Sequence, residues 1–213
     1  MQKSTRSKTA YTGWLAAALV VGIVAATGFQ DSAKIGAVDL IRVVTESRIQ
    51  GDVSPRVLAA STVRDTILEY MRIEKILTKE QCERFRDLEL KEDKTDVEKA
   101  EILAIKSAVT VAVKDFDEIS VKQGTLTDDE KRRLEDYSMR RATTAVLWAD
   151  WVRVFDQELQ IMAQEADNEM FARAISAAQV VAKQDGYSIV YPMTSVVYVA
   201  NDITDKAIVE ANR

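Results

Sequence analysis

The chain has 213 residues, of which 47% are hydrophobic and 30% are charged, and it contains only seven glycines and two prolines. This composition is typical of a helix-rich domain or an elongated subunit and not of a disordered chain. There is no histidine and only one cysteine, Cys82. These counts exclude an intrachain disulfide, a metal site built from Cys and His, and a histidine-based catalytic triad.

Residues 1–28 have the pattern of a secretory signal peptide. Lys3, Arg6 and Lys8 form a basic start, and an apolar stretch at 14–26 ends in small residues. We expect the leader to be cleaved after export by the general secretory route to the periplasm or cell envelope. The alternative is an uncleaved anchor, because residues 11–30 carry no charge and are about long enough to span a bilayer.

Loss of the leader makes the remaining chain more acidic. The number of Lys and Arg residues falls from 29 to 26, while Asp and Glu stay at 34, which gives a net charge of −8. Nucleic-acid binding needs a basic patch, so we expect no nucleic-acid partner. We expect membrane contact only through an uncleaved leader.

After the leader, residues 29–53 are expected to hold a first strand and a short helix. The strand is predicted over 34–40, and the helix over 40–49 should stop near Gly51. A new helix is then expected at Ser54-Pro55, with Ser as N-cap and Pro at the first helical position, and it should run to about residue 76.

Three capping boxes divide the next part of the chain. A Thr is followed three residues later by Glu or Gln each time, which satisfies two free backbone donors at a helix start. The boxes predict helices over 79–91 and 96–121 and a third helix from 128. They are Thr78 with Gln81, Thr95 with Glu98, and Thr127 with Glu130.

The helix from 128 is expected to run to residue 184, because this stretch contains no proline or glycine. Gly186 follows as a plausible C-cap. At ~1.5 Å per residue such a helix is roughly 85 Å long and needs a partner along its length. Its middle shows the spacing of a coiled-coil seam at Trp148, Val152, Phe155, Leu159, Met162 and Ala166.

The region 54–184 therefore reads as a helical arm. Its segmented N-terminal side and the long helix have similar lengths, which favours an antiparallel hairpin with its tip near 121–127. The alternative is that residues 79–127 form a small helical head at the tip. The sequence leaves both arrangements open.

Residues 185–213 are expected to hold two strands and a terminal helix. The strands are predicted over 188–191 and 195–199 with a tight turn at Pro192, and the helix over 204–212. Pairing with the first strand would make a small sheet. Three short strands cannot hold a long arm unaided, so we expect an oligomeric base.

Several of these segments together resemble the Skp/OmpH family of periplasmic chaperones. They are Lys34-Ile-Gly-Ala-Val-Asp39 after a signal peptide, a charged helical hairpin, and then Ile189-Val-Tyr191, Val197-Tyr198 and Asp202-Ile-Thr204. The resemblance covers the layout of the whole mature chain and is specific at the β segments. Family members are typically basic, whereas this chain is acidic.

The resemblance implies a mainly α fold, in which long antiparallel helical hairpins stand on a short-stranded barrel that forms on trimerisation. It implies a homotrimer that holds unfolded outer-membrane proteins in a cavity between the arms, without ATP. The residues expected in the base and oligomer core are Ile35, Val38, Ile189, Val190, Val197, Tyr198 and Ile203.

A chaperone of this kind needs an adaptable surface that binds weakly, which methionine and aromatic side chains supply. Candidate client-binding residues are therefore Trp151, Met139, Met170 and Phe116. For each of them the alternative is ordinary packing inside the hairpin, which is the default for large aromatics.

We expect no enzyme, no cofactor and no metal. Glu158 and Glu165 lie a heptad apart, but a di-metal site in a helical bundle also needs histidine, which is absent. The basic clusters at 131–133 and 140–141 lie beside acidic residues and are expected to form ion pairs within the helix. The second functional hypothesis is a membrane-tethered coiled-coil spacer or scaffold of the cell envelope.

Overall fold

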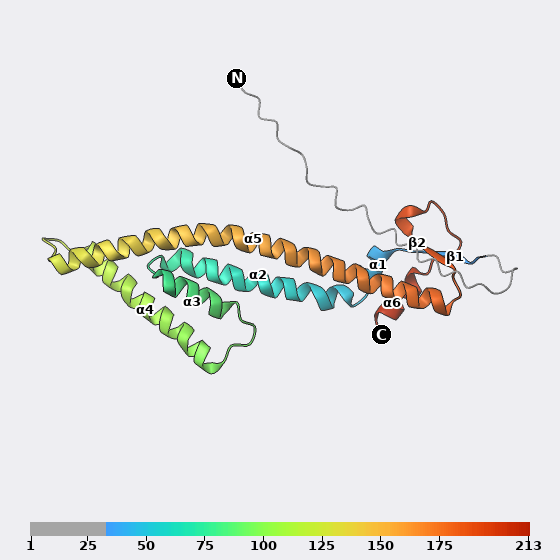
Figure 1. The fold of residues 1–213 in the computed structure, drawn as a ribbon, viewed down its shortest axis with the longest axis horizontal. Helices are drawn as coiled ribbons and strands as arrows, with labels where there is room; N and C mark the ends of the chain where they lie inside the picture. Colours follow the sequence, from blue (N-terminus) through green and yellow to red (C-terminus); the bar gives the residue numbers. More distant parts are fainter. Residues whose placement is uncertain (1–32) are drawn as a thin grey trace, which may run out of the picture. The chain divides into compact units, whose positions relative to one another are not determined.

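The computed structural model describes residues 33–213, and the predicted leader lies outside this range. The described chain is mostly helical and divides into two compact units (Figure 1). One unit comprises residues 49–170, and the other joins the segment up to Arg48 to residues 171–213. The long helix α5, Asp128–Gln184, contributes to both units.

The unit of residues 49–170 contains α2 (Ile49–Glu74), α3 (Lys79–Glu89), α4 (Asp96–Ser120) and the first part of α5. All three predicted capping boxes form. Thr78 and Thr95 bond reciprocally with Gln81 and Glu98. Thr127 does the same with Glu130, with backbone-to-side-chain distances of 2.8 and 3.2 Å. These local contacts explain why the helix starts follow directly from the sequence.

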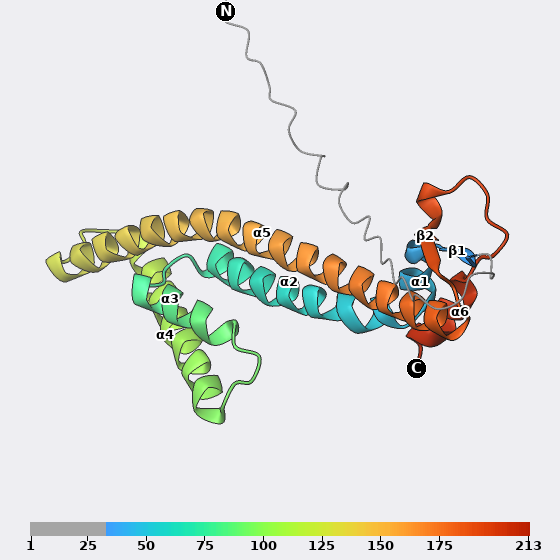
Figure 2. The same cartoon turned by 45° about the vertical axis from the view of Figure 1, so that its right-hand side comes forward.

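Figures 1 and 2 show α2 beside α5, whereas α3 and α4 lie together and diverge from that pair. We call α3 and α4 the side branch. It is joined to the other helices by a core to which α2, α3, α4 and α5 all contribute. This core contains Ile67, Met71, Leu77, Cys82, Phe85, Leu88, Ile102, Val109, Trp151 and Phe155. The chain reverses direction between α2 and α3 and again between α3 and α4, at the two helix breaks that the capping boxes predict (Figure 1).

The beginning of α2 differs from the prediction. The short helix α1 ends at Glu46, and α2 begins at Ile49, so that Gly51 and Pro55 both lie inside a helix. Ser54 is therefore not an N-cap. Pro55 is exposed and lies in the second turn, where the only backbone bond it removes is the one to the carbonyl of Gly51. Burial of Ile49 and Val53 favours the earlier start.

The second unit is built around β1 (Ile35–Val38), which pairs in parallel with β2 (Ile189–Pro192). On its other side, Ala37 donates to the Asn201 carbonyl and accepts from the Ile203 amide, both at 2.9 Å. Helices α1 (Leu40–Glu46) and α6 (Thr204–Ala211) pack against each other. Asp39 caps α1 through its side chain and bonds to Thr204 through its backbone amide.

Glycine is required at two positions in this second unit. Gly186 ends α5 with φ of +71°, and the amide of Tyr187 bonds back to the Ala182 carbonyl, so the predicted C-cap is confirmed. Gly36 lies in β1, where an added Cβ would lie 2.9 Å from the ring of Tyr187. A side chain at Gly36 would therefore force the ring of Tyr187 to move.

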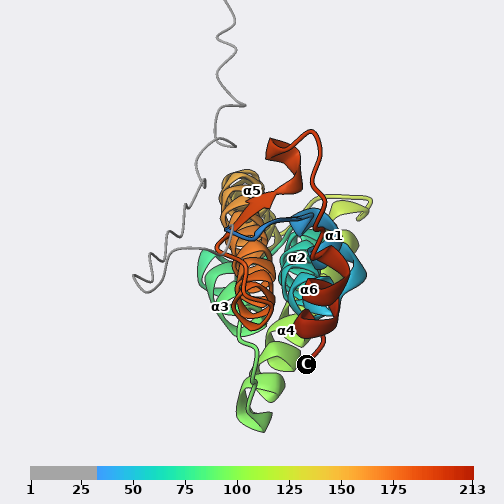
Figure 3. The ribbon, with the colours of Figure 1, turned by 90° about the vertical axis from the view of Figure 1, so that its right-hand side faces the viewer.

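The predicted strand over 195–199 is wrong. Figure 3 shows this stretch as a loop that leaves β2. Met193–Ser195 forms a single 3₁₀ turn, and residues 196–200 have no strand partner within residues 33–213. Residues 201–203 occupy the position of a third strand instead, because they lie beside Ala37 and bond to its backbone. The β-branched run has the propensity for a strand, but the inner position beside β1 is already occupied.

Candidate functional surfaces

Trp151, a predicted client-binding residue, is buried in the core and 5% exposed. Its ring packs near Phe155, and the guanidinium of Arg86 lies 4.8 Å from the ring centroid. The neighbouring Trp148 is half-buried and donates its indole N–H to the carbonyl of Leu68 at 3.1 Å. Trp151 is therefore part of the packing between α5 and its neighbours and offers no free surface within the chain.

The buried side of α5 departs from the predicted seam at one position. Val152 is 37% exposed, and the neighbouring Trp151 is buried instead. A straight helix has 3.6 residues per turn, so its buried side drifts relative to a strict seven-residue repeat. The other seam residues are buried or half-buried, as predicted: Trp148, Phe155, Leu159, Met162 and Ala166.

The other three client-binding candidates have different surroundings. Met139 is 65% exposed, whereas Met170 is half-buried. Phe116 is half-buried and meets Tyr137 edge to face, with ring centroids 6.2 Å apart. The structure does not bring the four candidates together into one surface. Met139 alone is openly available to a partner.

Charged pairs hold α2 against α5. Arg64, which is largely buried, contacts Glu158 at 2.9 Å, and Arg56 pairs with Glu169. The carbonyl of Leu68 on α2 adds a third contact, because it accepts the indole N–H of Trp148 on α5. Glu158, considered above as a metal ligand, is therefore already engaged by an arginine.

Near the α4–α5 connection, Asp115 accepts hydrogen bonds from two sides. The guanidinium of Arg133 lies 2.6 Å from one oxygen, and the hydroxyl of Tyr137 lies 2.7 Å from the other. Burial raises the pKa of Tyr137, and its bond to Asp115 raises it further. The hydroxyl therefore stays protonated as a donor. This network fixes the turn between the helices.

Cys82 is buried in the core of the side branch, and its Sγ lies 3.9 Å from the Thr144 hydroxyl. Burial raises the pKa of the Cys82 thiol to about 11. A thiol with this pKa is protonated at neutral pH and is a poor nucleophile. Thr144 in turn donates to the carbonyl of Leu77 at 3.2 Å, so both groups serve packing.

Within residues 33–213 no group of three or more Cys, Asp or Glu side chains lies close enough together to hold a metal ion. Over the same range no helix is long and apolar enough to cross a membrane. An open hollow on the surface of α5 has a volume of about 490 Å³. Gln157, Gln160, Ile161 and Gln164 of α5 line it, and none of them is charged. The sequence analysis missed this uncharged row, although its helical spacing is visible in the sequence.

The base residues fall into three groups. Val38 and Ile203 are buried inside their own chain, and Ile189 and Val190 are half-buried. Ile35 is 44% exposed. Val197 and Tyr198 are almost fully exposed in the loop after β2.

No protein-family profile, no characterised protein and no solved structure matches this chain, so its functional assignment rests on the residues and surfaces described above.

Proposed function

We propose that the chain is an ATP-independent periplasmic holdase, which binds unfolded outer-membrane proteins between helical arms of a homotrimer. The observation that carries this proposal is the open, uncharged hollow on α5, lined by three glutamines and Ile161. Amide and apolar groups bind extended polypeptide weakly and in many arrangements, as a holdase requires. Nearby acidic groups are not part of the lining.

Exposed apolar residues on the same helical unit extend this weakly binding surface. Leu58 and Ile73 of α2 and Met139 of α5 are each at least 60% exposed. They are interspersed with exposed ion pairs such as Arg72–Glu69, which keep the surface soluble without a large apolar patch. This mixture suits transient capture of an unfolded chain better than a permanent interface.

The proposed trimer is supported by the incomplete β structure of the second unit. The backbone amide of Ser188 donates to the Lys34 carbonyl of the chain that leads into β1. In a parallel pair every second residue of a strand bonds to the same neighbour, so the backbone groups of Ile189 and Tyr191 point to the other side of β2. This edge of β2 is not covered by another strand among the described residues. The β-branched run 195–199 has no strand partner among the described residues of its own chain, and in the proposed base it pairs with strands of other copies.

A second candidate function is a coiled-coil spacer of the cell envelope. It is favoured by α5, which continues through 57 residues and is capped at both ends. A spacer needs length and rigidity but no affinity for unfolded protein. The two candidates therefore differ in one measurable property.

The experiment is an aggregation assay with the full chain after export and processing in the periplasm. Its mass in solution is measured first, and a urea-unfolded outer-membrane β-barrel protein is then diluted into it without ATP. The holdase proposal predicts a trimer that suppresses light scattering at near-stoichiometric amounts. A trimer without effect would favour the spacer, and a monomer would contradict the proposed architecture.

A matched pair of variants locates the client surface. Ile161→Asp places a charge in the uncharged hollow and should weaken suppression several-fold. Val209→Asp changes an equally exposed apolar residue on α6 and should have no effect. Equal activity of both variants would show that the hollow is not where clients bind.

A further inference from the structure

Helix α4 presents an uncharged outer face along about four turns. Its opposite side, including Ile102 and Val109, is buried in the core. The outer residues are small or apolar, so another helix can approach closely. They are Val97, Ala100, Leu103, Ala104, Ser107 and Val111, and all are exposed. We call this set the α4 outer face.

Helix α5 has a comparable surface on the side opposite Trp151 and Phe155. It consists of Ser138, Ala142, Ala145, Val146, Ala149 and Val152, all of them exposed. We call this set the α5 outer face. Val146 is 70% exposed and Leu103 of the α4 outer face is 67% exposed, so neither surface is covered by its own chain.

The two outer faces cannot meet within one chain while the core is intact. Near their connection, α4 and α5 contact each other through other residues, including Ile119, Phe116 and Tyr137. Turning the outer faces toward each other would remove these residues from the core. Neither outer face can therefore serve as the partner of the other within the same chain.

The two outer faces complement each other in a single antiparallel register. In this register Val97 of one copy lies opposite Val152 of a second copy, and Leu103 lies opposite Val146. The small residues match in the same way, with Ala100 opposite Ala149, Ala104 opposite Ala145, and Ser107 opposite Ala142. Small or apolar residues thus face each other throughout the uncharged part of both faces, with a serine in two of the pairs.

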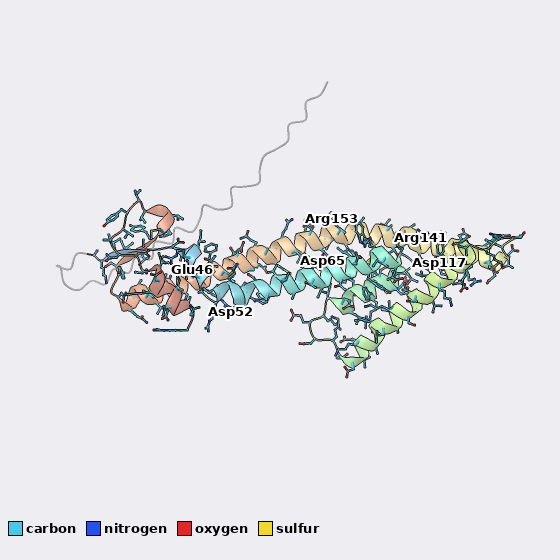
Figure 4. The ribbon with its side chains drawn as sticks, turned by 180° about the vertical axis from the view of Figure 1, so that it is seen from behind. Glu46, Asp52, Asp65, Asp117, Arg141 and Arg153 are labelled. Carbon is cyan, nitrogen blue, oxygen red and sulfur yellow. The ribbon has the colours of Figure 1, made fainter. Side chains whose placement is uncertain are left out.

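The same register also pairs the charges at one end. Asp96 and Lys99 form an exposed ion pair on α4, and Asp150 and Arg153 form one on α5. The register places Asp96 opposite Arg153 and Lys99 opposite Asp150, so four charges alternate in sign. Figure 4 labels Arg153 on α5.

The other end repeats this arrangement. Lys114 and Glu118 form an exposed ion pair on α4. They lie opposite Glu135 and Lys131 of α5, respectively, and both of these side chains are exposed. Opposite signs again face each other. Asp117, labelled on α4 in Figure 4, lies opposite Arg132.

A parallel alignment of the same two faces loses this match. With Val97 opposite Ser138, Leu103 meets the buried Thr144 and Ser107 meets the half-buried Trp148. Both lie on the inner side of α5, so the exposed residues of the two outer faces match in the antiparallel direction and not in this parallel one.

We propose that the α4 outer face of one copy packs antiparallel against the α5 outer face of a second copy. The contact joins two different surfaces, so each copy offers one of each kind. The uncharged stretch from 97 to 111 corresponds to roughly 22 Å of helix at ~1.5 Å per residue. This interface does not depend on the proposed chaperone function or on the base.

Cysteine cross-linking between two full-length variants tests the pairing. One variant carries Ala100→Cys and the other Ala149→Cys, and the buried Cys82 is retained in both. After mixing and mild oxidation we expect a disulfide-linked dimer that contains one chain of each kind. Each variant alone should give little product, because position 100 does not face position 100 of another copy.

A register control uses Ala163→Cys, which is equally exposed on α5. Mixed with Ala100→Cys it should give no dimer above background. An equal yield at both positions would overturn the proposed register. A link that forms only within a chain carrying both Ala100→Cys and Ala149→Cys, and not in the mixture, would overturn the second copy as the partner.

Exchanging the charges of one predicted ion pair distinguishes cross-links that form in the proposed interface from those that form by random collision. Lys114→Glu in the Ala100→Cys chain should lower the cross-linking yield about two- to five-fold, as expected for one exposed charge pair. Glu135→Lys in the Ala149→Cys chain should then restore it. Lys79→Glu changes another exposed lysine, which forms an ion pair on α3, and should have no effect. Failure of Glu135→Lys to restore the yield would contradict the register.

Discussion

At the scale of single residues, side chains that seemed suited to function serve packing instead. Trp151 and Cys82 are both buried in the core that joins the side branch to α5. Thr144 is the one polar side chain of α5 that is fully buried there, and it satisfies the carbonyl of Leu77 just before α3. This bond secures the chain reversal between α2 and α3.

Thr144→Val should lower the free energy of unfolding by about 1 kcal/mol, because it keeps the shape of the side chain but leaves the Leu77 carbonyl without its donor. Urea denaturation followed by circular dichroism measures the change. Thr66→Val removes an exposed hydroxyl that bonds within α2 and should cost less than about 0.5 kcal/mol. Equal losses would mean that the buried bond contributes nothing of its own.

At the scale of elements, the ends of the helices are set by contacts between residues close in sequence. Lys91 lowers the pKa of Glu98 to about 2, and the bonds to Thr95 contribute further. Lys122 and Thr127 lower the pKa of Glu130 to about 2 in the same way. The starts of α4 and α5 therefore depend on two ionised carboxylates.

Because both pKa values lie below the ordinary value of 4.5, the stability that these carboxylates contribute is present above pH 4.5 and is lost as the pH falls toward 2. Amide hydrogen exchange at the starts of α4 and α5 should accelerate over this range. The variants Glu98→Gln and Glu130→Gln keep the capping geometry but cannot ionise, so each should abolish the pH dependence at its own helix. An unchanged pH profile would refute this account.

The irregular start of α2 gives a prediction of its own. Pro55 lies inside the helix without an amide hydrogen, and it is exposed. Pro55→Ala should raise the free energy of unfolding by up to about 3 kcal/mol. Gly51→Ala, with nothing within 4 Å of the added Cβ, should raise it by about 1 kcal/mol. Thermal unfolding measures both changes. A lower stability of Pro55→Ala would mean that the conformation imposed by the proline stabilises α2.

At the scale of the whole molecule, the unit around β1 leaves two large apolar side chains exposed in the loop after β2. Val197 and Tyr198 contact little of their own chain, although their sequence favours a strand. In the proposed base, copies of the chain supply the missing neighbours. Stability of the single chain and assembly should therefore respond differently to a charge at this site.

Val197→Asp should change the stability of the single chain by no more than about 0.5 kcal/mol, because the side chain is fully exposed. It should nevertheless dissociate the proposed trimer, since a charge in a covered interface is costly. Sedimentation equilibrium measures the mass. Val209→Asp on α6 serves as the control and should remain associated, and a Val197→Asp trimer would contradict the role of this loop.

The sequence by itself determined the features that depend on neighbouring residues. The helix starts at Asp96 and Asp128, the end of α5 before Gly186 and the mainly helical content all follow from caps, glycine and the absence of breakers. Only the tertiary structure decided which of two neighbouring residues of α5 enters the core and which segment lies beside β1. Trp151 replaced Val152 in the core, and residues 201–203 replaced 195–199 in the sheet, because packing partners distant in sequence select among faces and segments of similar propensity.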